Sequence, residues 1–174
     1  SKKIISINQI KNLSKSLKEK IYFDLKKIKS KKKNFSNLNF EKSPNLLGVL
    51  NLTPDSFSDG GKFNTKTKGV NQAINLKNYG ANLIDIGGES TRPGSKGISA
   101  RLEWNRINKI LKLLIKKRIP LSLDTRKSNI MEKGIIEGVQ LINDVSGLDF
   151  DVNTISILKK YNVPFVIQHA KGLP

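Results

Sequence analysis

The chain has 174 residues with a net charge of +18, 37% hydrophobic residues, no cysteine and one histidine. This length fits one domain with a real core, and the missing cysteines exclude disulfides, thiolate metal sites and cysteine nucleophiles, as expected for a protein of the reducing cytoplasm. No stretch approaches the roughly 20 apolar residues of a membrane helix, and the N-terminus lacks the apolar segment of a secretory signal, so we expect no membrane partner.

The N-terminal segment, residues 1–43, carries most of the positive charge. It holds 13 lysines against three acidic residues, which leaves a net charge of +8 on the rest of the chain. From about Asn8 to Lys33, apolar side chains recur every three or four residues and predict a basic amphipathic helix, followed by a Ser/Asn-rich linker to Pro44. Three roles stay open for this segment: packing on the main domain, binding of RNA or an anionic surface through its lysines, or an unstructured extension.

Residues 44–174 form the predicted main domain. Short apolar runs alternate there with longer stretches of helical period, which is typical of βα units. The pattern predicts strands at residues 46–50, 83–86, 121–123, 139–142 and 165–167, and helices at about 67–79, 102–117, 128–137 and 151–161. Because the runs are apolar throughout, we expect parallel strands buried on both faces. In the helix at 102–117, Trp104, Ile107 and Leu111 share one apolar stripe, and we expect the charges on the opposite face.

Polar residues directly follow each predicted strand. They are Asn51, then Asp85 with Gly87-Gly88-Glu89, then Asp124, then Asn143-Asp144, then Gln168-His169. In a (β/α)8 barrel these positions ring one mouth, whereas a doubly wound sheet concentrates polar groups at one switch point. We therefore predict an α/β fold: a partial (β/α)8 TIM barrel, about its first five βα units, with a basic N-terminal helical extension. Because the chain starts at Ser1 and stops after the fifth strand, we expect the N-terminal part of a longer protein, inactive alone.

The loop after the first strand, within residues 48–61, is rich in short polar side chains. It contains Asn51, Thr53, Asp55, Ser56 and Asp59, with Pro54 and two glycines as hinges. Such a loop suits a mobile cover that coordinates a cation or an oxyanion. An ordinary turn built on Asp and Ser side chains is the alternative.

The loop after the second strand, within residues 85–94, places Thr91 and Arg92 among glycines. Glycines allow close backbone approach, a hydroxyl donates, and the guanidinium fork matches a phosphate, so an anion site is predicted, with a purely structural loop as the alternative. The segment lacks the Lys-Ser/Thr ending of a P-loop and the spacing of a dinucleotide fingerprint, which disfavours ordinary nucleotide-binding classes.

Asp124 and Asn143 end the third and fourth strands and form the third candidate element. On neighbouring strands, a carboxylate and an amide together match a heterocycle edge that offers N–H donors and an acceptor, as guanine and pterin do. Capping of the next helix is the structural alternative for Asp124, and a turn is the alternative for Asn143.

Five segments resemble dihydropteroate synthase in that family's order and spacing. They are residues 48–61 (GVLNLTPDSFSDGG), 85–94 (DIGGESTRPG), 122–127 (SLDTRK), 141–147 (LINDVSG) and 169–174 (HAKGLP). The resemblance, over about residues 46–174, implies a sulfonamide-target enzyme of folate biosynthesis with Mg²⁺ as cofactor. That family joins p-aminobenzoate to 6-hydroxymethyl-7,8-dihydropterin diphosphate, giving 7,8-dihydropteroate and diphosphate. It also implies these two small molecules as partners, no nucleic acid, and a homodimer.

The resemblance also implies roles residue by residue. Asn51 matches the residue that touches Mg²⁺ and the diphosphate, and Asp124 and Asn143 match two residues that hold the pterin. Thr91 and Arg92 match the loop where diphosphate and p-aminobenzoate meet, and Pro93 matches a wall of the aminobenzoate pocket. The remaining matches are in the loop that folds over the reacting centre, namely Asp55, Phe57 and Asp59. Of all these, Arg92, Asp55 and Asp59 are the candidate catalytic residues.

Two departures and three rival interpretations accompany the resemblance. Gln168-His169-Ala170 stands where the family usually has Met-His-Met, and we assign His169 no catalytic role. The resemblance implies a later Asp, Lys and Arg-x-His, which we expect only in a continuation of the chain beyond Pro174. A corrinoid methyltransferase of the same fold would not need the anion loop, and a basic RNA- or surface-binding protein would explain only residues 1–43. A catalytically dead relative is the third rival.

Overall fold

The computed structural model describes residues 6–42, 44–53, 65–91 and 94–168, and the chain forms two compact units, Ser1–Asn34 and Phe35–Pro174. In the first unit, a 3-10 helix η1 (Ile7–Asn12) precedes helix α1 (Lys15–Lys29). The prediction of one helix from residue 8 to residue 33 was therefore wrong. Leu13 and Ser14 have extended backbone (ψ 166° and 153°), which interrupts the hydrogen-bond ladder, and Ser30 is extended again after α1.

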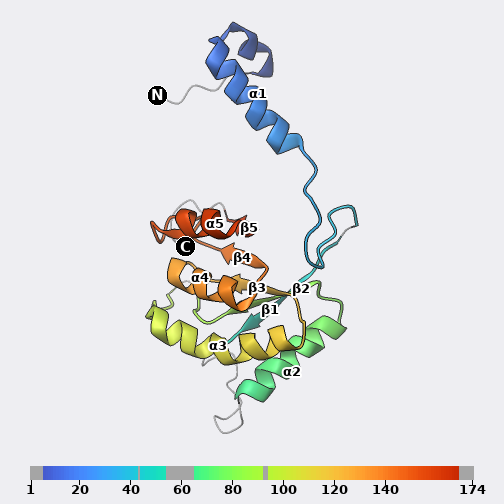
Figure 1. Ribbon diagram of the computed structural model, residues 1–174, viewed down its shortest axis with the longest axis vertical. Helices are drawn as coiled ribbons and strands as arrows, with labels where there is room; N and C mark the ends of the chain where they lie inside the picture. The colour runs from blue at the N-terminus through green and yellow to red at the C-terminus, as the bar shows by residue number, and fades with distance from the viewer. Residues whose placement is uncertain (1–5, 43, 54–64, 92–93, 169–174) are drawn as a thin grey trace. The chain divides into compact units, whose positions relative to one another are not determined.

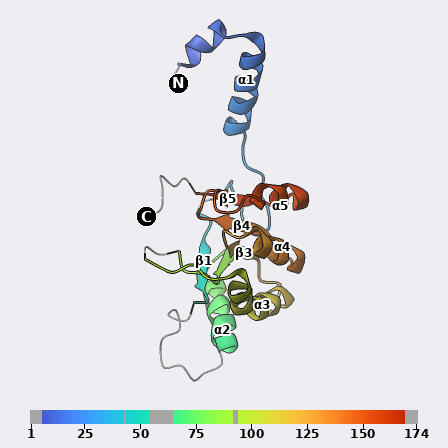
Figure 2. The same cartoon turned by 90° about the vertical axis from the view of Figure 1, so that its left-hand side faces the viewer.

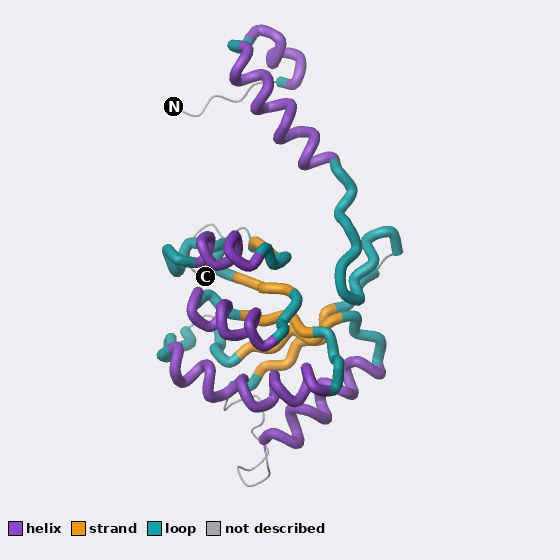
Figure 3. Tube along the Cα trace, in the orientation of Figure 1, coloured by secondary structure: helices purple, strands orange, loops and turns teal. Residues whose placement is uncertain are grey.

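The second unit contains one sheet of five parallel strands in the order β1-β2-β3-β4-β5 (Figures 1 and 3). The strands are β1 (Leu47–Asn51), β2 (Leu83–Gly87), β3 (Leu121–Asp124), β4 (Leu141–Asp144) and β5 (Phe165–Ile167). The helices between them are α2 (Thr65–Asn78), α3 (Ala100–Lys116), α4 (Ser128–Glu137) and α5 (Thr154–Tyr161). These are the predicted strands and helices, each within three residues of its expected bounds. No helix in the described ranges is long and apolar enough to cross a membrane.

The largest shift in a strand boundary concerns β4, which begins at Leu141 rather than at residue 139. The backbone N–H of Val139 donates to the carbonyl of Gly134 (3.0 Å), so it closes the end of α4 instead of joining the sheet. Gly138, with φ 112°, makes the left-handed turn that this ending requires.

All four helices of this unit lie on one side of the sheet, which Figure 2 shows edge-on. The core lies between sheet and helices, with Ile86 and Leu123 from the strands and Ile107, Leu111 and Ile130 from the helices all fully buried. Sequential strand order with helices on one side is the arrangement of a βα barrel, because a doubly wound sheet reverses its order and has helices on both sides. The prediction of the first five βα units of a TIM barrel is confirmed.

The expectation that every strand is buried on both faces was wrong. Strand β2 is buried throughout, but β1 alternates, with Val49 59% exposed, and all three residues of β5 are exposed. The one-sided cover explains β1, because side chains alternate across a strand and the described residues place helices only on one face. Strand β5 is at the edge of the sheet and has a neighbouring strand on one side only.

Candidate active site at the carboxyl ends of the strands

Three predicted ligand-binding residues share one row across the sheet. In the strand register Asn51 pairs with Gly87, Gly87 pairs with Asp124, and Asp124 pairs with Asn143. Parallel strands end at the same edge, so residues at the ends of β1 to β4 are brought side by side although they span more than 90 positions in the chain. The structure thus brings Asn51, Asp124 and Asn143 together, as the sequence predicted.

Gly87 makes the space in the middle of this row. A Cβ atom at that position would lie 3.4 Å from Asp124 Oδ2 and 3.7 Å from Asn51 Oδ1. The Asn51 amide and the Asp124 carboxylate therefore both border the volume that Gly87 leaves open, one from each side. A planar ligand group can approach the backbone closely there.

Asp85 was named among the polar strand-end residues, but the sequence assigned it no role in the site. It lies on β2, it is 5% exposed, and its Oδ2 accepts a 2.9 Å hydrogen bond from Asn143 Nδ2. Within the described part of the chain, Asp85 Oδ1 and Asp124 Oδ1 are buried without a hydrogen-bond partner. Buried acceptors without donors are costly, so these oxygens are suited to a ligand that supplies N–H groups.

The electrostatic environment of Asp124 changes its protonation. Burial, and then the nearby negative charges of Asp85, Glu103, Asp144 and Glu89, raise the pKa of Asp124 to about 7. In the absence of a cationic or hydrogen-donating ligand, this carboxyl is therefore protonated in part of the molecules near neutral pH.

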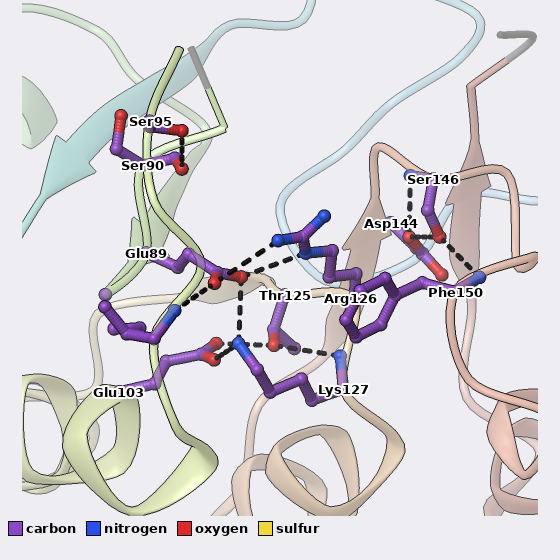
Figure 4. Close-up of polar contacts among 12 residues, drawn as sticks. Glu89, Ser90, Ser95, Glu103, Thr125, Arg126, Lys127, Asp144, Ser146 and Phe150 are labelled. Atoms are coloured by element: carbon purple, nitrogen blue, oxygen red, sulfur yellow. Dashed lines mark hydrogen bonds and ion pairs between the residues drawn. The ribbon is translucent and has the colours of Figure 1, made fainter. Parts of the chain in front are cut away.

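The first residues of the second loop pack against helix α3. The carbonyl of Gly88 accepts a 2.8 Å hydrogen bond from Arg106 Nη1, and a Cβ at Gly88 would lie 2.9 Å from the Glu103 carbonyl oxygen. The hydroxyl of Ser95 closes the loop by donating to the carbonyl of Ser90 (2.6 Å; Figure 4). Thr91 is exposed between these anchored parts, where a ligand can reach it.

The other predicted site residues lie outside the described residues. They are Asp55, Phe57, Asp59, Arg92 and Pro93. His169, which was assigned no catalytic role, also lies outside the described residues. The sequence reasoning also missed a largely buried charged cluster that begins two residues before Thr91, made by Glu89, Glu103, Arg126 and Lys127. A signal for it was present, because Glu103 lies four residues before Ile107 and therefore on the apolar stripe of α3. Its burial contradicts the expectation that the charges of this helix take the opposite face, and Lys127 Nζ at 2.6 Å is the reason.

Asn51 is the described residue that could contribute to a metal site. In the described ranges, no group of three or more His, Asp or Glu side chains is placed to hold a metal ion. Mg²⁺ does not require such a group, because it keeps several waters and binds one or two protein oxygens together with substrate phosphates. The Asn51 amide oxygen beside Gly87 fits a shared site of that kind.

Comparison with known proteins agrees with this geometry. The family model described as "Pterin binding enzyme" matches residues 47–174. The chain belongs to the pterin-binding enzyme family. The family match starts at the first residue of β1, so the Lys-rich N-terminal unit of this pterin-binding enzyme lies outside it.

Relatives of this pterin-binding enzyme include dihydropteroate synthases. The one from Clostridium beijerinckii is 43% identical over 125 residues, which cover 71% of this chain and 46% of that protein. The structure of dihydropteroate synthase from Clostridium difficile, determined in the presence of pteroic acid, matches with a TM-score of 0.70 at 40% identity, covering 74% of this chain and 49% of that one. The enzyme from Xanthomonas albilineans with 4-aminobenzoic acid also has a TM-score of 0.70, at 38% identity, and the match covers 74% of this chain and 47% of that one. The chain spans about half the length of the curated relatives it matches.

Proposed function

We propose that the protein containing this chain is a dihydropteroate synthase, which joins p-aminobenzoate to 6-hydroxymethyl-7,8-dihydropterin diphosphate and releases diphosphate. The observation that carries the proposal is the row of Asn51, Asp124 and Asn143 beside the loop that bears Thr91. The carboxyl ends of the strands thus offer acceptors for a donor-rich heterocycle close to a loop that can bind an anion. The likeness to dihydropteroate synthases at about 40% identity supports it.

The pterin ring binds at the strand ends. Its N–H groups donate to the Asp124 carboxylate, and the side-chain amide of Asn143 completes the recognition of the ring edge. Because a donated hydrogen bond favours the charged carboxylate, ring binding lowers the raised pKa of Asp124.

The reaction replaces a C–O bond by a C–N bond. The bond between the pterin CH₂ carbon and the diphosphate oxygen breaks, and its electrons leave with the diphosphate. The positive charge on the CH₂ carbon is delocalised into the ring until the lone pair of the p-aminobenzoate nitrogen forms the new bond and its proton is lost. Thr91 and Arg92 bind the diphosphate, and Arg92 stabilises its developing charge. No protein nucleophile is needed, and the chain contains no cysteine.

Mg²⁺ is the proposed cofactor, held by Asn51 and by substrate oxygens. When bound, it neutralises charge on the leaving diphosphate. In this proposal the first loop covers the reacting centre with Asp55, Phe57 and Asp59. Pro93 forms a wall of the p-aminobenzoate pocket. A cytoplasmic location is consistent with the absence of cysteine, and the proposed assembly is a homodimer.

The test is product formation by the full-length gene product. The purified protein is mixed with 6-hydroxymethyl-7,8-dihydropterin diphosphate, p-aminobenzoate and Mg²⁺, and mass spectrometry follows 7,8-dihydropteroate. We expect product that requires both substrates and stops when Mg²⁺ is chelated. Absence of product, together with methyl transfer from methyltetrahydrofolate to a corrinoid, would replace this function by that of a pterin-binding methyltransferase.

A further inference from the structure

The residue just before the exposed part of the second loop is a buried glutamate. Glu89 follows the glycine pair at the end of β2 and stands two residues before Thr91, yet it is only 7% exposed. A charged side chain is rarely buried unless it is paired, so its partners define its role.

Three residues from two loops contact the Glu89 carboxylate. Arg126 Nε and Lys127 Nζ, from the loop after β3, lie 3.0 Å and 2.8 Å from Oε2. The backbone N–H of Ile98, two residues before α3 at the far end of the connection between β2 and α3, donates to Oε1 over 2.9 Å. Glu89 therefore ties both ends of the loop to each other and to the neighbouring loop (Figure 4).

Lys127 extends this bridge into the helix layer. Its ammonium group also lies 2.6 Å from Glu103 Oε2 on α3, and Glu103 is fully buried. Glu103 in turn accepts a 2.5 Å hydrogen bond from the hydroxyl of Thr125, which directly follows Asp124. The cluster therefore connects the loop of Thr91 to the strand end that carries Asp124.

The cluster is balanced in charge and largely buried. It contains two carboxylates, whose side chains are at most 4% exposed, and two cations, with the Lys127 side chain 12% and the Arg126 side chain 21% exposed. Burial acts to raise the pKa of Glu89, but hydrogen bonds from Arg126, Lys127 and the Ile98 amide outweigh it and hold the pKa below 4.5. The Glu89 carboxylate therefore stays ionised near neutral pH, and its ion pairs are present there.

We propose that Glu89 is a positioning residue, which holds the second loop against the loop after β3 so that Thr91 faces the anion while Asp124 faces the ring. This inference rests on the proposed function and deepens it. A bridge placed at the carboxyl ends of the strands acts where a βα barrel does its chemistry, and fold stability is governed more by the opposite end.

The experiment compares Glu89→Ala and Glu89→Gln with wild type in the full-length gene product. The Gln side chain keeps an oxygen that can accept from Ile98 but loses the charge that pairs with Lys127. Hydrogen exchange measures the amides of residues 90–98 without any substrate. We expect exchange there to rise at least tenfold in Glu89→Ala, by less in Glu89→Gln, and to stay unchanged in β2 and β3.

Affinity measurements with two ligands distinguish the diphosphate part of the site from the pterin part. We expect the affinity for inorganic diphosphate and kcat to fall at least tenfold in Glu89→Ala, while the affinity for 6-hydroxymethylpterin, which lacks the diphosphate, changes less than twofold. Glu137→Ala, which breaks the Lys112–Glu137 ion pair at the other end of α4 (2.9 Å), is the matched control and should change neither.

Two results would overturn the proposal: unchanged exchange in residues 90–98, or parallel losses of pterin and diphosphate affinity, which would mean a general structural role. Failure of the wild-type protein to make dihydropteroate would refute the proposed function instead. The exchange result still decides whether Glu89 holds the loop, because that measurement needs no substrate.

Discussion

Asn143 on β4 donates its side-chain amide to the carboxylate of Asp85 on β2, across the intervening strand, at 2.9 Å. The contact turns Nδ2 of the Asn143 amide toward Asp85 and Oδ1 away from it. In the proposed function, Asp85 therefore orients the amide that recognises the pterin ring.

Removing that carboxylate should loosen the pterin ring. In Asp85→Ala the Asn143 amide loses its orienting partner, and we expect the affinity for 6-hydroxymethylpterin to fall about tenfold, the scale of one hydrogen bond to a charged group. Fluorescence titration of the full-length gene product measures it. Asp149→Ala, an exposed aspartate in the loop after β4, is the control and should bind normally. Equal affinities in the two variants would contradict an orienting role for Asp85.

Stability should depend on pH through Asp124. Its pKa is raised from 3.8 to about 7, so between those values the folded chain holds a proton that the unfolded chain lacks, and stability falls as pH rises through this window. Asp124→Asn removes this loss. Relative to wild type, the variant's free energy of unfolding should improve by about 3 kcal/mol between pH 5 and pH 8, about two pKa units. Urea unfolding at both pH values gives the difference, and a constant difference would contradict the raised pKa.

Arg92 is expected to serve the anion without supporting the fold. Arg92→Ala in the full-length gene product should reduce turnover roughly a hundredfold, as loss of one charge-stabilising donor does elsewhere. The melting temperature should stay close to that of wild type. Arg101→Ala, on the exposed side of α3, is the matched control. Wild-type turnover in Arg92→Ala would withdraw its assigned role.

Gly88 should tolerate no side chain. A Cβ there would lie 2.9 Å from the Glu103 carbonyl oxygen, a backbone atom that cannot swing away, and 2.9 Å from Ile107 Cγ2. We expect Gly88→Ala to lower the free energy of unfolding by about 1–3 kcal/mol, measured by denaturant unfolding. Gly97→Ala, in the same loop, meets nothing closer than 3.5 Å and should be nearly neutral. Similar losses in both variants would mean that the loop, and not the contact with α3, is sensitive.

The strand-end residues could be predicted because parallel strands fix where they meet. Once the apolar runs are identified as consecutive parallel strands, Asn51, Asp124 and Asn143 have to end at the same edge, and their row follows from the topology. The helices could be predicted for a different reason: an amphipathic helix repeats its apolar residues every three or four positions, and this pattern is visible in the local sequence.

The pairing of the buried charges could not be predicted, because contacts between distant positions leave no local pattern. The position of Glu103 on the apolar stripe of α3 indicates burial, but its partner Lys127 lies 24 positions later in the chain. Likewise, the exposure of β5 depends on what covers a face of the sheet, which a run of three apolar residues does not encode.

The balanced cluster around Glu89 also shapes how this region can evolve. If Glu103 or Lys127 alone loses its charge, the remaining members keep an uncompensated charge in a dry environment, which is strongly destabilising. Two simultaneous replacements that restore neutrality are far less costly. We therefore expect the changes in the free energy of unfolding at Glu103 and Lys127 to be strongly non-additive, with the double variant losing less stability than the sum of the two single variants.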